Sequence, residues 1–141
     1  MQLKVLLLSE FTYLNTGYAN YYRNLASALT DSGHQVVELA SYGDWNNPKH
    51  TDYAADCKWQ VYLNIPHKSS KELYEEYQER EKVSSDAKFG SWCYEKVLLL
   101  EKPDVVIGLR DHWYDKFAVD SPLAKYVTLI LSPTVDAMPQ K

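Results

Sequence analysis

The chain has 141 residues, a hydrophobic fraction of 45% and a formal net charge of −4 at pH 7. Its length suits one domain over residues 1–141, and its acidic balance predicts no nucleic-acid partner. Cys57 and Cys93 form no CxxC or metal-spaced cluster, which favours a reducing compartment over a disulfide scaffold. The apolar run Leu3–Leu8 is too short for a signal peptide, and no stretch approaches the length of a transmembrane helix. We therefore expect a cytoplasmic protein.

The first forty residues predict a complete β-α-β unit. Val5–Leu8 is a continuous apolar run, typical of a strand that is buried on both faces. The helix that follows can be capped by Asn15 or Thr16, and Gly33 suits its C-terminal end. Val36–Leu39 is the second predicted strand. The apolar face of the helix contains Tyr18, Tyr22, Leu25, Ala26 and Leu29.

The middle of the chain predicts a loop, an edge strand and two helices. Residues 42–56 are polar and aromatic without a period, which indicates a loop. Residues 59–65 alternate between apolar and polar, so we expect a strand near a sheet edge with one wetter face. Residues 69–81 predict an exposed helix with a serine cap, because their charge run is typical of a solvated face. Residues 85–101 predict a second helix with an apolar stripe.

Two further apolar runs complete the pattern. Val105–Leu109 and Val127–Leu131 predict the fourth and fifth strands, and residues 111–125 predict a helix broken at Pro122. Continuous apolar strands that alternate with helices are typical of a parallel sheet covered on both faces. The sequence therefore predicts an α/β fold: a Rossmann-like parallel sheet of five strands in the order 3-2-1-4-5, with helices on both faces.

A sheet of this order binds ligands outside the carboxyl ends of its strands, where the strand order reverses. We expect three segments to meet at that switch point between the first and fourth strands: residues 9–17, 109–115 and 132–139. The first of these lacks the glycines of GxGxxG and of the Walker pattern, which argues against a tight dinucleotide pyrophosphate site. Gly17 brings helix N-terminal N–H groups near a ligand and favours an anion or a sugar hydroxyl, although one glycine is also common in plain turns.

The densest polar and aromatic cluster follows the fourth strand. Asp111 and His112 are candidate catalytic residues that would contact sugar hydroxyls, and Trp113 and Tyr18 offer stacking surfaces. Alternatively, Asp111 caps a helix and Trp113 lies in the core. Asp136, after the fifth strand, either binds a ligand hydroxyl or fixes a turn. No second ligand is spaced to pair with His112, so we expect no metal site.

Several of these segments together resemble the N-terminal half of GT-B-fold glycosyltransferases of the retaining family 4 type. The resemblance is carried by residues 4–8, by Thr16-Gly17-Tyr18-Ala19, by residues 25–29 and by Ser32-Gly33-His34-Gln35-Val36. Pro103-Asp104 before the fourth strand and Pro133-Thr134-Val135-Asp136 after the fifth are similar to further family elements. The chain departs from the family in having Thr16-Gly17 where Gly-Gly is common, and in the position and reversed order of Asp111-His112.

The resemblance implies that a sugar passes from a nucleotide-sugar donor to an acceptor, and that this domain mostly holds the acceptor. A second Rossmann-like domain would bind the nucleotide sugar, so no cofactor is expected in residues 1–141. The chain would then be half of a catalytic unit and inactive alone, and its exposed interdomain face could self-associate. Whether the acceptor lies in a membrane stays open.

Two other functions fit parts of the sequence. One is a stand-alone ligand-binding or regulatory module of flavodoxin-like shape, without catalysis. The other is an NAD- or nucleotide-dependent enzyme, which the missing glycines argue against. An acidic residue at the end of the second strand would also be expected there, and Glu38 lies inside that strand instead.

Overall fold

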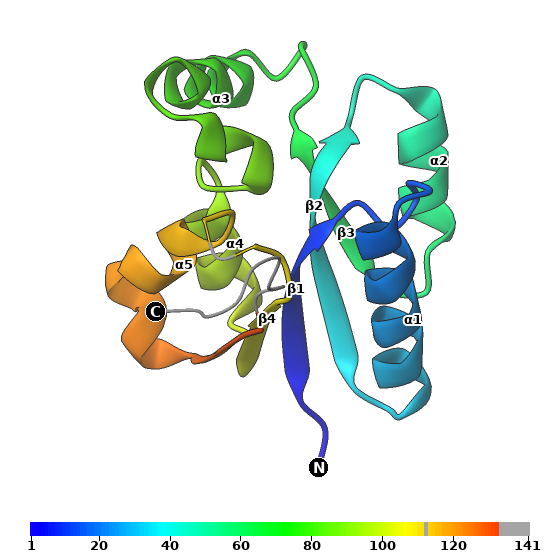
Figure 1. Ribbon diagram of the computed structural model, residues 1–141. Helices are drawn as coiled ribbons and strands as arrows, with labels where there is room; N and C mark the ends of the chain where they lie inside the picture. Colours follow the sequence, from blue (N-terminus) through cyan, green and yellow to red (C-terminus); the bar gives the residue numbers. More distant parts are fainter. Residues whose placement is uncertain (112, 133–141) are drawn as a thin grey trace.

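The computed structural model describes residues 1–111 and 113–132, and its centre is a five-stranded, all-parallel sheet (Figure 1). The strand order is β3-β2-β1-β4-β5, which confirms the Rossmann-like order predicted from the sequence. The carboxyl ends of β1 and β4 lie side by side at the point where the order reverses. The strands are β1 (Lys4–Glu10), β2 (Gln35–Asp44), β3 (Gln60–Ile65), β4 (Val105–Gly108) and β5 (Thr128–Leu131).

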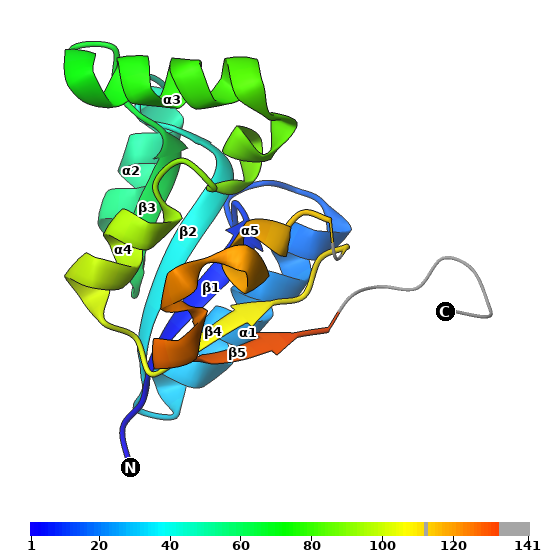
Figure 2. The ribbon, with the colours of Figure 1, turned by 90° about the vertical axis from the view of Figure 1, so that its left-hand side faces the viewer.

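Helices cover both faces of this sheet, as predicted. Helices α1 and α2 lie on one face and α4 and α5 on the other, while α3 lies beyond the carboxyl ends of the strands (Figures 1 and 2). Among the described residues, no helix has both the length and the apolar character needed to cross a bilayer. The helices are α1 (Gly17–Asp31), α2 (Pro48–Asp56), α3 (Lys71–Val83), η1 (Ser85–Phe89), α4 (Tyr94–Glu101), α5 (Lys116–Asp120) and η2 (Pro122–Tyr126).

Strand β1 is the centre of the core. Leu6, Leu7 and Leu8 are completely buried, because helices pack on both sides of the strand. Leu6 and Leu8 belong to the cluster on the α4 side, whereas Leu7 packs in the cluster that contains Tyr22 and Ala26 of α1. The unbroken apolar run of β1 therefore reflects a strand with no solvent-facing side.

Helix α1 begins and ends as its sequence predicts. Thr16, and not Asn15, is the N-cap, and its Oγ1 accepts a hydrogen bond from the Ala19 N–H at 3.1 Å. Gly33 follows the helix with φ +91°, a conformation that costs glycine little. These two ends fix where the chain leaves β1 and where it enters β2.

The loop predicted over residues 42–56 is wrong, because β2 continues to Asp44 and α2 follows it. The β2–β3 register shifts between Ala40 and Asp44, and Tyr42 within that irregularity has φ +69°. The Asn47 side chain caps α2 by accepting from the Lys49 N–H at 3.0 Å, and Pro48 occupies the first turn. An Asn-Pro pair that indicates a turn is here the start of a helix.

The single helix predicted over residues 85–101 is also wrong. Gly90 separates η1 from α4 with φ +101°, and a Cβ at this position would lie 2.7 Å from Cδ2 of Leu39. Only glycine satisfies both the conformation and the close approach to β2. The helix predicted over residues 111–125 is shorter and divided, into α5 and η2, and the break lies at Ser121 next to Pro122.

Strand β3 is an edge strand, as predicted, and its second face is exposed at Gln60 but buried at its carboxyl end. Asn64 is completely buried on that face. Its side-chain amide donates to the Ala87 carbonyl at 2.7 Å, and its Oδ1 accepts from Nε1 of Trp92 at 2.9 Å. Segment η1 and the residues after it thus cover the carboxyl end of a strand face that the sequence pattern assigns to solvent.

Glu38 is a buried acid in the middle of β2 that holds the loop after β1. Its carboxylate accepts hydrogen bonds from Ser9 Oγ (2.9 Å), from the N–H and Oγ1 of Thr12 (2.9 and 2.8 Å) and from Nε1 of Trp59 (3.0 Å). Burial raises the pKa of Glu38 above its ordinary value of 4.5, and these hydrogen bonds oppose that rise. Glu38 is therefore a structural anchor for the first loop rather than a ligand contact.

We predict that replacing Glu38 with glutamine changes how stability depends on pH. Because the folded pKa is raised, the carboxyl stabilises the fold fully below about pH 4.5 and loses this contribution as pH rises through the folded pKa. The difference in unfolding free energy between wild type and Glu38→Gln, measured by urea titration, should therefore decline with rising pH. A difference that stays constant or grows with pH would contradict this assignment.

Candidate functional site

A pocket of about 740 Å³ lies at the switch point, where β1 and β4 end. Each of the three segments that the sequence predicts to meet there contributes to its lining, with Leu109 alone from residues 109–115 and Ser132 from the third segment. We call it the switch-point pocket. Its lining residues are Glu10, Thr16, Gly17, Tyr18, Tyr21, Leu109 and Ser132.

The N-terminus of α1 forms one wall of the switch-point pocket. Gly17 is the first residue of α1, and a Cβ added to it would meet no atom within 4 Å. Thr16 Oγ1 donates a hydrogen bond to Oε2 of Glu10 at 2.5 Å while it caps the helix. The carboxylate of Glu10 thus lies next to the N-cap of α1, at the positive end of the helix dipole.

A second carboxylate, that of Asp111, is hydrogen-bonded to the pocket residue Tyr18. The Tyr18 hydroxyl donates to Oδ1 of Asp111 at 3.4 Å and so joins α1 to the segment that follows β4. Glu10 lines the pocket, and Asp111 does not line it but lies one hydrogen bond away from the lining residue Tyr18. Negative charge at these two positions opposes a phosphate group and suits ligands that donate hydroxyl hydrogens. Of the two ligand classes that Gly17 allowed, the anion is therefore disfavoured.

Two side chains of this lining that could contact a ligand, Glu10 and Tyr21, are not among the site residues named from the sequence, although Glu10 lies within the predicted segment 9–17. Glu10 is the first acidic residue after the apolar run of β1, and its place at the carboxyl end of a central strand was the signal that could have found it. Tyr21 lies three residues after Tyr18, on the same side of α1, and is 60% exposed. Helical spacing from Tyr18 would have indicated it.

A buried ion pair lies next to the pocket residue Leu109. Arg110 and Asp115 are 3% and 1% exposed, and an Nη2 hydrogen bond from the guanidinium to Oδ1 joins them. Nη1 of Arg110 donates to Ser41 Oγ at 2.6 Å and to the Ser9 carbonyl at 3.3 Å. One guanidinium therefore ties the ends of β1 and β2 to the residues between β4 and α5.

The backbone at the end of β4 packs closely against the Arg110–Asp115 ion pair. A Cβ at Gly108 would lie 2.6 Å from Oδ2 of Asp115, so the carboxylate occupies space that a side chain would take. Burial raises the pKa of Asp115, and the Arg110 guanidinium opposes that rise. The Leu109 N–H donates to the Tyr22 hydroxyl oxygen at 2.6 Å, which fixes the first residue after β4 against α1.

The structure brings together three of the predicted site residues. Gly17 and Tyr18 line the switch-point pocket, and Asp111 bonds to Tyr18. Trp113 instead lines a second groove and is 55% exposed, so its alternative placement in the core is wrong. Asp111 is not a helix cap either, because α5 begins at Lys116. His112 and Asp136 lie outside the described residues.

No group of three or more His, Cys, Asp or Glu side chains that could hold a metal ion occurs within residues 1–111 and 113–132. Comparisons with protein-family models, with curated proteins and with solved structures found no match. Any function assigned to the chain therefore rests on its sequence, its fold and the chemistry of its pockets.

We predict that Asp115→Ala destabilises the protein by about 3 kcal/mol or more, because it leaves the Arg110 charge buried without a counter-ion. The matched control is Lys116→Ala, which removes an exposed ion pair with Asp120 and should cost less than about 1 kcal/mol. Urea unfolding of the two variants measures both effects. Equal losses in the two variants would show that the buried pair does not hold the switch point.

Proposed function

We propose that residues 1–141 form the acceptor-binding, N-terminal half of a GT-B-fold glycosyltransferase similar to retaining family 4. Such an enzyme transfers a sugar from a nucleotide-sugar donor to an acceptor. The observation that carries the proposal is the switch-point pocket, which combines the N-terminus of α1 with Tyr18, Tyr21 and carboxylates at the carboxyl edge of a Rossmann-like sheet. The resemblance of the sequence to that family supports the same function.

The chemistry of the pocket favours a sugar over a dinucleotide. A pyrophosphate would approach the carboxylates of Glu10 and Asp111 without a glycine-rich loop to bind it. Sugar hydroxyls, in contrast, can donate to carboxylate oxygens and accept from helix N–H groups. The rings of Tyr18 and Tyr21 offer flat apolar faces for the C–H side of a sugar ring.

Catalysis in this proposal is positional and electrostatic. Asp111, with His112 as the second candidate, orients the acceptor hydroxyl toward the anomeric carbon of the donor. Gly17 allows close backbone approach, and Asp136 is a further candidate contact. A second Rossmann-like domain outside these 141 residues binds the nucleotide sugar and stabilises its leaving diphosphate.

We also propose that the protein works in the cytoplasm. Cys57 and Cys93 are free thiols rather than a disulfide, which is the usual state in a reducing compartment. Burial raises the pKa of both thiols, and that of Cys93 reaches about 12, so neither is activated as a nucleophile.

The pocket chemistry predicts which variants weaken sugar binding. Methyl glycosides of glucose, galactose, mannose and N-acetylglucosamine should be titrated into the labelled protein and followed by the amide shifts of Gly17 and Tyr18. Asp111→Asn and Tyr18→Phe should each weaken binding about tenfold, or about 1.4 kcal/mol, because the first replaces a charged acceptor oxygen with an amide donor and the second removes a hydroxyl. The exposed Tyr126 provides the matched control, Tyr126→Phe, which should change nothing. A shift of Gly17 by a dinucleotide and by none of the glycosides would contradict the proposal.

We further predict that purified residues 1–141 do not turn over nucleotide sugars. The proposed site holds the acceptor and not the diphosphate, so the leaving group has no stabilising contacts. Incubation with UDP-, GDP- and ADP-sugars, with and without the glycosides above, should release no nucleoside diphosphate above the background without protein. Robust turnover would show that the chain contains a complete active site.

A further inference from the structure

A second groove, of about 700 Å³, lies between α3–η1 on one side and α5 on the other. We call it the α3–α5 groove. It shares no lining residue with the switch-point pocket. Most of its surface is polar, with aromatic residues among the lining, of which half-exposed Trp113 is the most accessible. These aromatic residues are Phe89, Trp92, Tyr94, Trp113 and Phe117.

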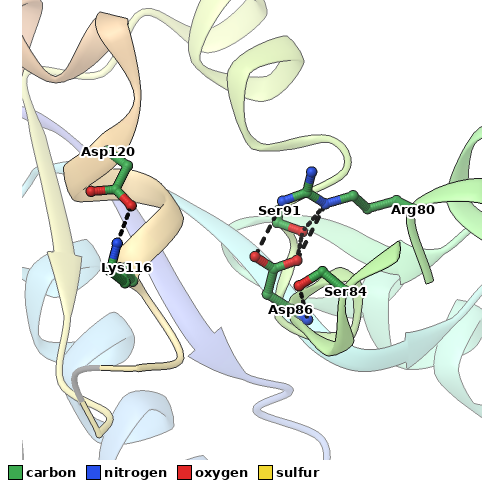
Figure 3. A network of polar contacts seen from close by, with 6 residues as sticks. All are labelled: Arg80, Ser84, Asp86, Ser91, Lys116 and Asp120. Atoms are coloured by element: carbon green, nitrogen blue, oxygen red, sulfur yellow. Dashed lines mark hydrogen bonds and ion pairs between the residues drawn. The ribbon is translucent and has the colours of Figure 1, made fainter. Parts of the chain in front are cut away.

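Charged side chains on both walls are paired within their own wall (Figure 3). On the α3–η1 side, Nε and Nη2 of Arg80 donate to the two carboxylate oxygens of Asp86 at 3.2 Å each, and Ser91 Oγ donates to Oδ1 of Asp86 at 2.6 Å. On the α5 side, Lys116 pairs with Asp120. A further lining acid, Glu95, accepts a hydrogen bond from Ser121 Oγ at 2.8 Å instead of pairing with a base, so the groove presents polar atoms on both walls with a slight excess of acids.

Two further lining groups extend this pattern. Lys96 pairs with Glu76 and lies 5.8 Å from the centre of the Trp92 ring. Each of the basic residues Arg80, Lys96 and Lys116 thus has an acidic partner. A charged ligand would have to compete with these pairs, whereas the hydroxyls of a neutral ligand can hydrogen-bond to them without breaking them.

The floor of the groove contains a buried hydroxyl with unused bonding capacity. Tyr94 is 1% exposed, and its hydroxyl has no hydrogen-bond partner among the described residues. Its ring packs edge-on against Phe117, with the ring centres 5.3 Å apart. A buried hydroxyl left without a partner is uncommon and costs free energy, and because this one is inaccessible it is not among the groups offered to a ligand.

We propose that the α3–α5 groove is a carbohydrate-binding site for a neutral oligosaccharide, separate from the switch-point pocket. Aromatic rings take the C–H faces of the sugar rings, and the paired charges on the two walls take their hydroxyls. The proposal does not require the chain to be part of a glycosyltransferase, because it rests on residues that the switch-point pocket does not use.

Binding of hexasaccharides tests this proposal directly. The probes are the neutral hexamers of glucose, mannose and N-acetylglucosamine, with the anionic hexamer of galacturonic acid as the charged counterpart, followed by calorimetry and tryptophan fluorescence. We expect at least one neutral hexamer to bind more tightly than the anionic one. Trp113→Ala should weaken that binding about threefold to tenfold, the effect of one aromatic contact. Trp45→Ala is the matched control, because Trp45 is 41% exposed and does not line the groove.

A second variant tests the groove without relying on the ring of Trp113 alone. The double substitution Lys116→Ala and Asp120→Ala removes an exposed pair from one wall, so it should leave the fold intact while it weakens binding. The proposal is overturned if no neutral hexamer binds, if the anionic hexamer binds more tightly, or if Trp113→Ala and Trp45→Ala behave alike. Binding that depends on Asp111→Asn and not on Trp113→Ala would place the sugar in the switch-point pocket, which overturns this proposal and supports the acceptor site.

Discussion

The buried Arg110 guanidinium is the interaction on which the geometry of the sheet's carboxyl edge depends. It bonds to the Ser9 carbonyl and Ser41 Oγ, at the ends of β1 and β2, and to Asp115 ahead of α5. Segments about 30 and 100 residues apart in sequence thereby meet at one charge. Because a buried ion is costly to leave unpaired, this arrangement tolerates little displacement. Leu109 and Asp111, on either side of Arg110, are thus held toward α1 and the switch-point pocket.

The molecule has two pockets that differ in their charges, the switch-point pocket and the α3–α5 groove. The switch-point pocket carries carboxylates that a helix N-terminus and a tyrosine hydroxyl hold in place. The α3–α5 groove carries three ion pairs and the further acid Glu95 beside aromatic rings. Both surfaces disfavour anions, for different electrostatic reasons, and both suit ligands with many hydroxyls. The switch-point pocket and the α3–α5 groove therefore favour the same class of ligand, one rich in hydroxyl groups.

Much of the fold could be predicted because its strongest signals are local. Continuous apolar runs mark the buried strands, their alternation with helices predicts the Rossmann-like order, and Thr16 marks the start of α1. The missed features depend on contacts between distant residues. Gly90 breaks a helical pattern because β2 lies against it, and Asn64 is polar yet buried because η1 satisfies its amide. For the site, position at strand ends was enough to find Gly17, Tyr18 and Asp111, but not the packing that directs Trp113 toward α3. The glycosyltransferase function stays a prediction from resemblance and chemistry.

The most direct test of this account is the charge preference of the switch-point pocket. The affinities of methyl glucoside and of its 6-phosphate can be compared through the amide shift of Gly17. Because Glu10 and Asp111 carry negative charge at this pocket, we predict that the neutral glycoside binds at least about tenfold more tightly, a difference of about 1.4 kcal/mol. Equal or tighter binding of the phosphate would show that the helix N-terminus, and not the carboxylates, determines the ligand, and would contradict the proposed acceptor site.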